Sequence, residues 1–207
     1  MNQPDYDGAV AYARSRMERE LAPELLYHGL SHTYEHVLPA AMRLAERCYL
    51  NQQETALLRV AAAFHDIGWI EGRTEHEKEG VRIVRQVLPT FGFQDGHINR
   101  IAGIIMATRI PQTPHNLVEQ IMADADLDIL GREDFWSRNQ DLRTERSLTG
   151  NPMSDEEWYQ HQLQFLESHS YFTEAAKQFR DEGKQTHIKE IEQRLEQSRE
   201  ASLPQHE

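Results

Sequence analysis

Histidines at intervals of four residues mark the first segment of this sequence that could carry chemistry. They are His28, His32 and His36, within YHGLSHTYEHV at residues 27–37. Residues four apart share one face of a helix, so His32 and His36 could point the same way. Imidazole is the commonest metal ligand and also an acid or base near neutral pH. Metal binding and proton transfer are therefore the two chemistries to consider.

Two further segments supply carboxylates. His65 and Asp66 stand side by side in AAAFHDIG, at residues 61–68. An imidazole and a carboxylate at the end of an apolar, buried helix are costly unless both are paired or bound to a cation. Residues 121–130 are apolar except for three acids at alternate positions. These acids are Asp124, Asp126 and Asp128. A mixed set of histidines and carboxylates suits a divalent ion such as Zn, Mn, Fe, Co or Ni.

Each segment taken alone also has a simpler interpretation. A single histidine is more often a hydrogen-bonded structural residue than a metal ligand. The acids at alternate positions could be solvated side chains at the end of a helix. The joint occurrence of all three segments favours one shared site, provided that the fold brings them together.

The elements that must position these side chains are predicted to be helices. Apolar residues recur at helical spacing nearly everywhere, and strand segments with hairpin turns are missing. Capping boxes or similar signals occur at residues 51–54, 74–77 and 154–157. Helices are expected over residues 7–20, 31–48, 51–65, 74–88, 96–108, 116–126, 133–146, 154–166 and 173–199, the last with a break at Gly183. The sequence thus predicts one all-α domain over residues 1–207.

Composition excludes several classes of function. The chain has 207 residues and a formal net charge of −12, which argues against binding to nucleic acid polymers or anionic membranes. A single cysteine, Cys48, allows no internal disulfide and no cysteine-based zinc site. Residues 1–20 lack the apolar core of a signal peptide, and no stretch is long and apolar enough for a membrane span. A cytoplasmic location is expected.

The three segments together resemble the HD superfamily of metal-dependent phosphohydrolases, whose signature is H…HD…D. This signature corresponds to His32, His65, Asp66 and Asp126. The context is similar as well, because YHGLSHT, AAAFHDIG and DADLDILG resemble the YHxxxHT, AALFHDIG and DADLDxLG segments of a branch of small HD proteins. The resemblance is anchored over residues 27–131.

The resemblance implies an HD-type helical bundle in which helices over residues 154–200 pack on the core. It implies one divalent ion, Mn, Fe, Co, Ni, Zn or Mg, bound by the four corresponding residues. The family pattern selects Asp126 over the neighbouring acids and His32 over His36. His76 lies where dinuclear members carry a further histidine, so it is a candidate for a second, weaker metal site. The tripeptide Gly-Tyr-Pro is absent, which argues against cyclic-di-GMP hydrolysis.

The expected function is hydrolysis of a small phosphoester or nucleotide by metal-activated water. Asp66 would be both ligand and proton acceptor, and His28 would protonate the leaving group. Candidate cations for the substrate phosphate are Arg109, Arg143 and Lys184. Two other functions stay open. One is a non-catalytic sensor or binding module that contains the metal, which full metal occupancy without turnover would indicate. The other is an HD-type iron oxygenase, which two bound irons and O₂ consumption would indicate.

Overall fold

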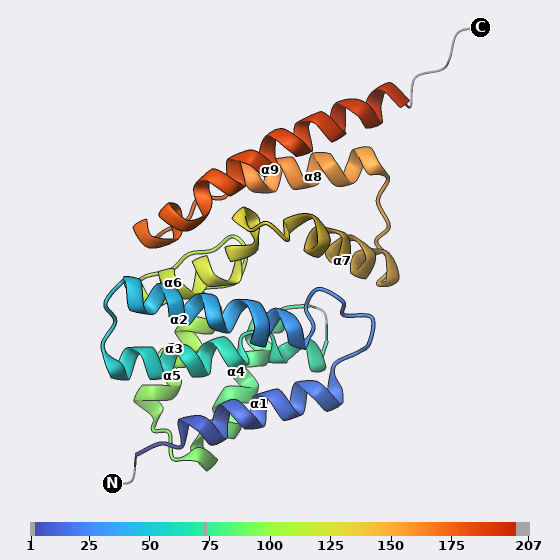
Figure 1. Cartoon of the computed structure of the whole chain (residues 1–207). Coiled ribbons are helices and arrows are strands. Elements are labelled where there is room, and N and C mark those ends of the chain that lie inside the picture. The colour runs from blue at the N-terminus through green and yellow to red at the C-terminus, as the bar shows by residue number, and fades with distance from the viewer. Residues whose placement is uncertain (1–2, 73, 202–207) are drawn as a thin grey trace, which may run out of the picture.

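Every regular element in the described part of the chain is helical (Figure 1), which confirms the predicted all-α class. The structure is a computed structural model that describes residues 3–72 and 74–201. Its α-helices are α1 (Tyr6–Glu20), α2 (Leu38–Arg47), α3 (Gln52–Phe64), α4 (His76–Val87), α5 (Asp95–Met106), α6 (Leu117–Asp126), α7 (Phe135–Leu148), α8 (Asp155–Ser168) and α9 (Glu174–Ala201). A π-helical turn (His32–Val37) precedes α2, and 3₁₀ turns cover Ile67–Ile70, Leu88–Phe91 and Asp128–Gly131. None of the described helices is long and apolar enough to cross a bilayer.

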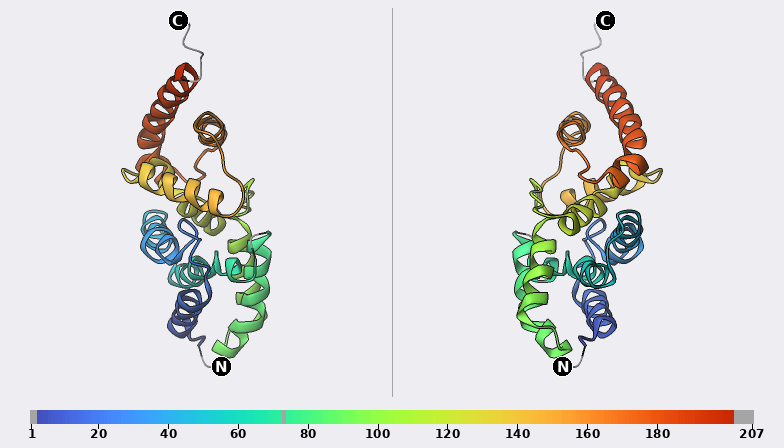
Figure 2. Two further views of the ribbon diagram at one scale, coloured as in Figure 1. Left: turned by 90° about the vertical axis from the view of Figure 1, so that its right-hand side faces the viewer. Right: turned by 90° about the vertical axis from the view of Figure 1, so that its left-hand side faces the viewer.

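Helix α3 forms the centre of the core. It contacts α1, α2, α5 and α6, and its apolar side chains are fully buried, among them Leu57, Val60, Ala61 and Phe64. Figure 2 shows the helices stacked along one long axis, with α1 and α5 towards one end and the α8–α9 pair at the other. Helix α9 packs against α8 and against the 3₁₀ turn Asp128–Gly131. The end of α3 therefore lies inside the molecule, where the His65–Asp66 pair follows it.

Side-chain caps are present at three of the predicted helix starts, near residues 51, 116 and 154, and absent at the one predicted near residue 74. The side chains of Asn51 and Asn116 cap α3 and α6, and Ser154 with Glu157 forms a complete capping box at α8. The capping box predicted at Thr74 is wrong, because α4 begins only at His76. The preceding residue, Glu75, has a left-handed backbone with φ of 53° and makes no side-chain cap.

The predicted break at Gly183 is also wrong, because α9 runs through it. A Cβ atom on Gly183 would overlap the carbonyl oxygen of Gly131, and one on Gly131 would overlap that of Arg180. The two glycines therefore allow close contact between α9 and the turn that follows α6. Beyond Gly183, the charged end of α9 buries one apolar stripe against the rest of the molecule, made of Ile188, Ile191 and Leu195.

We predict that His169 makes folding stability depend on pH. Both of its ring nitrogens are buried without a hydrogen bond from any described residue. Burial and the nearby Lys184 lower the pKa of His169 to about 4. Because the folded pKa lies below the unfolded one, the unfolded chain binds an extra proton as the pH falls from about 6.5 to 4. The free energy of unfolding should lose about 2 to 3 kcal/mol from this group over that range.

The test compares urea denaturation of the wild type and His169→Phe at several pH values. Phenylalanine keeps a ring beside Phe165 and Tyr171, which flank His169 at centroid distances of 6.4 and 4.6 Å. The variant should show a flatter decline of stability below neutral pH. Parallel curves for the two proteins would mean that His169 is not buried in its neutral form.

Candidate metal centre

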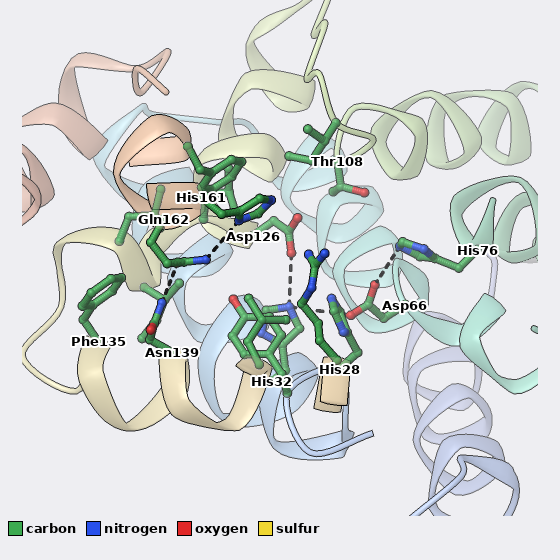
Figure 3. Close-up of a pocket in the computed structure, with 18 of the residues that line it drawn as sticks. His28, His32, Asp66, His76, Thr108, Asp126, Phe135, Asn139, His161 and Gln162 are labelled. Atoms are coloured by element: carbon green, nitrogen blue, oxygen red, sulfur yellow. Dashed lines mark hydrogen bonds and ion pairs between the residues drawn. The ribbon is translucent and has the colours of Figure 1, made fainter. Parts of the chain in front are cut away.

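Four side chains from three separate elements converge beside the end of α3. His32 lies in the π-helical turn, His65 and Asp66 directly follow α3, and Asp126 is the last residue of α6. Nε2 of His32 lies 3.2 Å from Oδ1 of Asp126 and 3.6 Å from Oδ2 of Asp66. Nε2 of His65 lies 3.4 Å from Oδ1 of Asp126 and 3.3 Å from Oδ2 of Asp66. We call these residues the four-residue cluster; Figure 3 shows three of them, His32, Asp66 and Asp126.

The local structure positions the two histidines of the cluster. His65 continues the fully buried face of α3, and its Nδ1 donates to the carbonyl oxygen of Ala62 at 2.9 Å. That hydrogen bond directs Nε2 of His65 towards the carboxylates. π-Helical turns are rare and are frequently found at functional sites. Here the turn begins at His32, whose side chain is only 5 % exposed.

The cluster fits a divalent ion. Nε2 of His65 and Oδ2 of Asp66 are buried and have no hydrogen-bond partner among the described residues. One ligand atom each from His32, His65 and Asp66 lies within 4.8 Å of the others, so this group could hold a metal. Metal–ligand distances near 2.0 to 2.2 Å place neighbouring ligands about 3 to 4 Å apart, similar to the spacing here. Two imidazoles and two carboxylates suit borderline divalent ions.

The charges also favour a bound cation. Burial opposes a charge on His65, but Asp66 and Asp126 outweigh burial and raise its pKa well above the usual range. Burial would raise the pKa of Asp66, yet His65 holds it well below the usual range. Burial lowers the pKa of His32 in spite of the carboxylates, which keeps that imidazole neutral and able to coordinate. Without metal, a proton on His65 supplies the positive charge, and metal binding would release it.

His76 lies on the other side of Asp66. Its Nε2 is 3.4 Å from Oδ1 of Asp66 and 3.6 Å from Oε1 of Glu77, which is 7 % exposed. Asp66 therefore presents one oxygen to the cluster and the other to His76. Trp69 stacks on both His76 and His28, at centroid distances of 4.5 and 4.4 Å, and the two imidazoles lie 6.2 Å from each other. The three rings lie together, and the loop that carries His28 reaches the cluster, with the His28 and His32 rings 6.1 Å apart.

His28 lies in that loop, before the first turn of the π-helical segment, and is held by a residue that the sequence did not reveal. Glu145 of α7 accepts from Nδ1 of His28 at 2.5 Å and from the backbone N–H groups of Tyr27 and His28. Burial alone would raise the pKa of Glu145, but these hydrogen bonds and His28 lower it. Glu145 is separated from His28 by 117 residues, so only the fold could show the pair.

The other two acids of the DADLD segment bind the C-terminal helices. Asp124 accepts from the backbone N–H groups of Phe172 and Thr173 and from the Thr173 hydroxyl, just before α9. Asp128 accepts from Arg43 and from two nitrogens of Arg180. Asp124 and Asp128, one on each side of Asp126, are thus structural residues that hold other segments by hydrogen bonds. Asp126 is the one acid of the three that reaches the cluster.

A cavity of about 350 Å³ opens next to the cluster. One face of α7 lines it through Phe135, Asn139, Leu142 and Arg146, spaced by four, three and four residues. Helix α8 adds His161, Gln162 and Phe165, and the cluster end adds His28, His32, Asp66, His76 and Asp126. The cavity therefore extends from the cluster to the space between α7 and α8.

The three cations expected at the substrate phosphate lie elsewhere. Arg109 is about half exposed and pairs with Glu75. Arg143 donates to the carbonyl oxygen of Met153 and pairs with Asp155. Lys184 donates to the carbonyl oxygen of His169. None of these three lines the cavity.

Arg146 does line it, one helical turn after Arg143. Its Nε is buried without a hydrogen-bond partner, and no carboxylate in the described part of the chain forms an ion pair with it. Arg146 belongs to the stripe of α7 that begins at Phe135, and its spacing from that residue was the signal that could have identified it.

Comparisons with known proteins find a family and two solved structures that are similar to this chain. A family model described as HD domain matches residues 30–128. A predicted HD superfamily hydrolase from an uncultured Thermotogales bacterium superposes with a TM-score of 0.62 at 19% identity, over 94% of this chain and 93% of that one. Bacillus subtilis YpgQ, solved in complex with ADP, gives a TM-score of 0.65 at 18% identity, over 97% and 95%. At these identities the structures establish a shared fold. No curated protein sequence matches the chain.

Proposed function

Because residues 30–128 form an HD domain, and because two imidazoles and two carboxylates converge at its centre, we propose that the protein is a metal-dependent phosphohydrolase. Its substrate is a small phosphoester or nucleotide, and water is the nucleophile. His32, His65, Asp66 and Asp126 hold one divalent ion. When bound, such an ion supplies Lewis acidity, which makes water a better nucleophile near neutral pH and stabilises charge on a phosphoryl group.

The buried, unpartnered atoms of His65 and Asp66 carry this proposal. Structural histidines and acids are ordinarily hydrogen-bonded when buried, whereas Nε2 of His65 and Oδ2 of Asp66 lie 3.3 Å apart as an ion pair without a hydrogen bond. Asp66, which lines the cavity beside the other ligands, is the proton acceptor for the attacking water. A weaker second ion would use Oδ1 of Asp66, His76 and Glu77, which lie together on the opposite side.

His28 is the general acid for the leaving group. Its Nδ1 donates to Glu145, which leaves Nε2 to carry the proton that is transferred. The ionised Glu145 carboxylate stabilises the imidazolium, and Trp69 fixes the plane of the ring. His28 lines the same cavity as the cluster, so a leaving oxygen could lie between them.

Arg146 binds the phosphate, and its replacement provides a test. A charged hydrogen bond contributes about 1.5 to 3 kcal/mol, so Arg146→Gln should lower kcat/KM for a phosphorylated substrate roughly 10- to 100-fold. Arg143→Gln, on the next face of α7, should have the smaller effect because Arg143 already pairs with Asp155. Steady-state kinetics of both variants checks this. A larger loss at Arg143 would assign the phosphate contact to that residue.

The activity itself is tested with a panel of phosphoesters and nucleotides in the presence of Mn²⁺, Co²⁺, Ni²⁺ or Mg²⁺. Nucleotides lead the panel because a protein of the same fold was solved with ADP. Phosphate or pyrophosphate release that requires the added metal supports the proposal. Full metal binding without turnover of any compound would instead identify a metal-containing binding module.

A further inference from the structure

The end of the cavity away from the cluster differs in character from the cluster end. We call it the distal end; it is lined by Phe135, Asn139, Leu142, Gln162 and Phe165. In Figure 3 the labelled residues Phe135, Asn139 and Gln162 lie on the side opposite to Asp66 and His76. A metal ion and one phosphate group would leave this part of the cavity unfilled, since its volume of about 350 Å³ is typical of sites for whole small molecules.

Two polar side chains of the distal end, Asn139 and Gln162, form a series of hydrogen bonds with Trp158, which does not line the cavity. Trp158, Asn139 and Gln162 are 2 %, 6 % and 5 % exposed. The indole Nε1 of Trp158 donates to Oδ1 of Asn139 at 2.9 Å. Nδ2 of Asn139 donates to Oε1 of Gln162 at 2.5 Å.

The indole group of Trp158 determines which atom donates and which accepts in each of these hydrogen bonds. Tryptophan Nε1 is a donor only, so the amide atom of Asn139 that faces it must be the oxygen. The nitrogen of Asn139 then faces Gln162, whose oxygen must accept. The amide nitrogen of Gln162 is left with two N–H groups. One faces Nδ1 of His161 at 3.4 Å, and the other has no acceptor among the described residues.

We propose that the distal end is a nucleobase subsite in which Gln162 donates a hydrogen bond to an acceptor atom on the edge of the base. The proposal deepens the phosphohydrolase function proposed above and rests on it, because the phosphate of the same nucleotide would lie at the cluster. The walls supply apolar contacts to the faces of the ring, mainly from Phe135, Leu142 and Phe165.

The combination of apolar walls and a hydrogen-bond donor favours a nucleobase over other ligand groups. A ligand with a purely apolar hydrocarbon group at this position would leave the Gln162 N–H buried without an acceptor, which costs about 1 to 3 kcal/mol. A sugar would place hydroxyl groups against the apolar walls. A nucleobase has flat apolar faces and carbonyl oxygens or ring nitrogens at its edge, and therefore satisfies both features.

Nucleosides test the subsite without the metal centre, because they carry the base but no phosphate. Adenosine, guanosine, cytidine and uridine are titrated into chelator-treated protein, and the side-chain amide signals of Asn139 and Gln162 and the indole signal of Trp158 are followed by NMR. At least one nucleoside should shift these signals. The absence of any shift at millimolar nucleoside would overturn the proposal, even if no variant could be folded.

Two glutamate substitutions on α8 provide the matched comparison. Gln162→Glu replaces the donor by an acceptor and should weaken binding of that nucleoside roughly tenfold, whereas Gln164→Glu makes the same change on the exposed face. Gln164→Glu should bind as the wild type does. Equal affinity in Gln162→Glu would overturn the assignment of the donor. Failure of the protein to hydrolyse any phosphoester would contradict the proposed function but leave these binding results valid.

Discussion

Replacing His65 by alanine should remove both the metal and the activity. The variant loses one of two imidazole ligands, and the several kcal/mol of transition-state stabilisation that a metal supplies correspond to roughly 10³-fold or more in rate. Metal content is measured after dialysis, and hydrolysis is measured with the substrate that the panel identifies. His115→Ala is the control, because His115 is exposed and does not line the cavity.

The same variant should also destabilise the metal-free protein. His65 supplies the positive charge that balances two neighbouring carboxylates, and it is completely buried. Removing one partner of a buried ion pair typically costs about 3 to 5 kcal/mol. Urea denaturation in the presence of a chelator measures this loss. A His65→Ala protein that retains stoichiometric metal and wild-type turnover would show that the four-residue cluster is not the metal centre.

The second large effect is expected at His28, and it should depend on the leaving group. Transfer of a proton to the leaving oxygen contributes about 10²- to 10⁴-fold in rate. His28→Ala should therefore slow hydrolysis of alkyl phosphoesters by that factor. It should slow p-nitrophenyl esters much less, because nitrophenolate leaves without a proton. Glu145→Gln should give an intermediate loss with the same preference, since it weakens the hydrogen bond at Nδ1 without removing the ring.

The alternative role of His28 is to order the loop that carries it. In that case His28→Ala would slow both kinds of ester equally, because the damage would affect binding of every substrate. Metal content should stay at the wild-type level in His28→Ala, since His28 is not among the four ligands. Loss of metal in this variant would also end its assignment as the acid.

Local signals in the sequence were sufficient for most of the helical architecture. Asn51, Asn116 and Ser154 cap helices by contacts within three residues, and such short-range contacts can be predicted from spacing. Glu75 and Gly183 could not be interpreted in this way. The backbone at Glu75 is left-handed, and Gly183 is required by contact with a turn more than 50 residues earlier in the chain.

The site shows the same division between local and long-range information. The motifs that resemble the HD family identified the four residues that the fold brings together. Asp124 has its partners 48 and 49 residues further along the chain, and Asp128 has Arg43 85 residues before it and Arg180 52 residues after it. Glu145 is 117 residues from His28. Arg146 continues the helical spacing of Phe135, Asn139 and Leu142 on α7, but only the packing of that helix shows that this stripe, and not Arg143, faces the cavity.

Stoichiometric return of metal to chelator-treated protein tests the central claim most directly. Mn²⁺ is added in steps while nucleotide hydrolysis is recorded on the same samples. We expect no hydrolysis without metal and an increase that parallels occupancy of the first equivalent, because one cluster holds the ion that the reaction needs. Hydrolysis that is equally fast without metal, or a fully occupied site without hydrolysis of any phosphoester, would contradict the assignment.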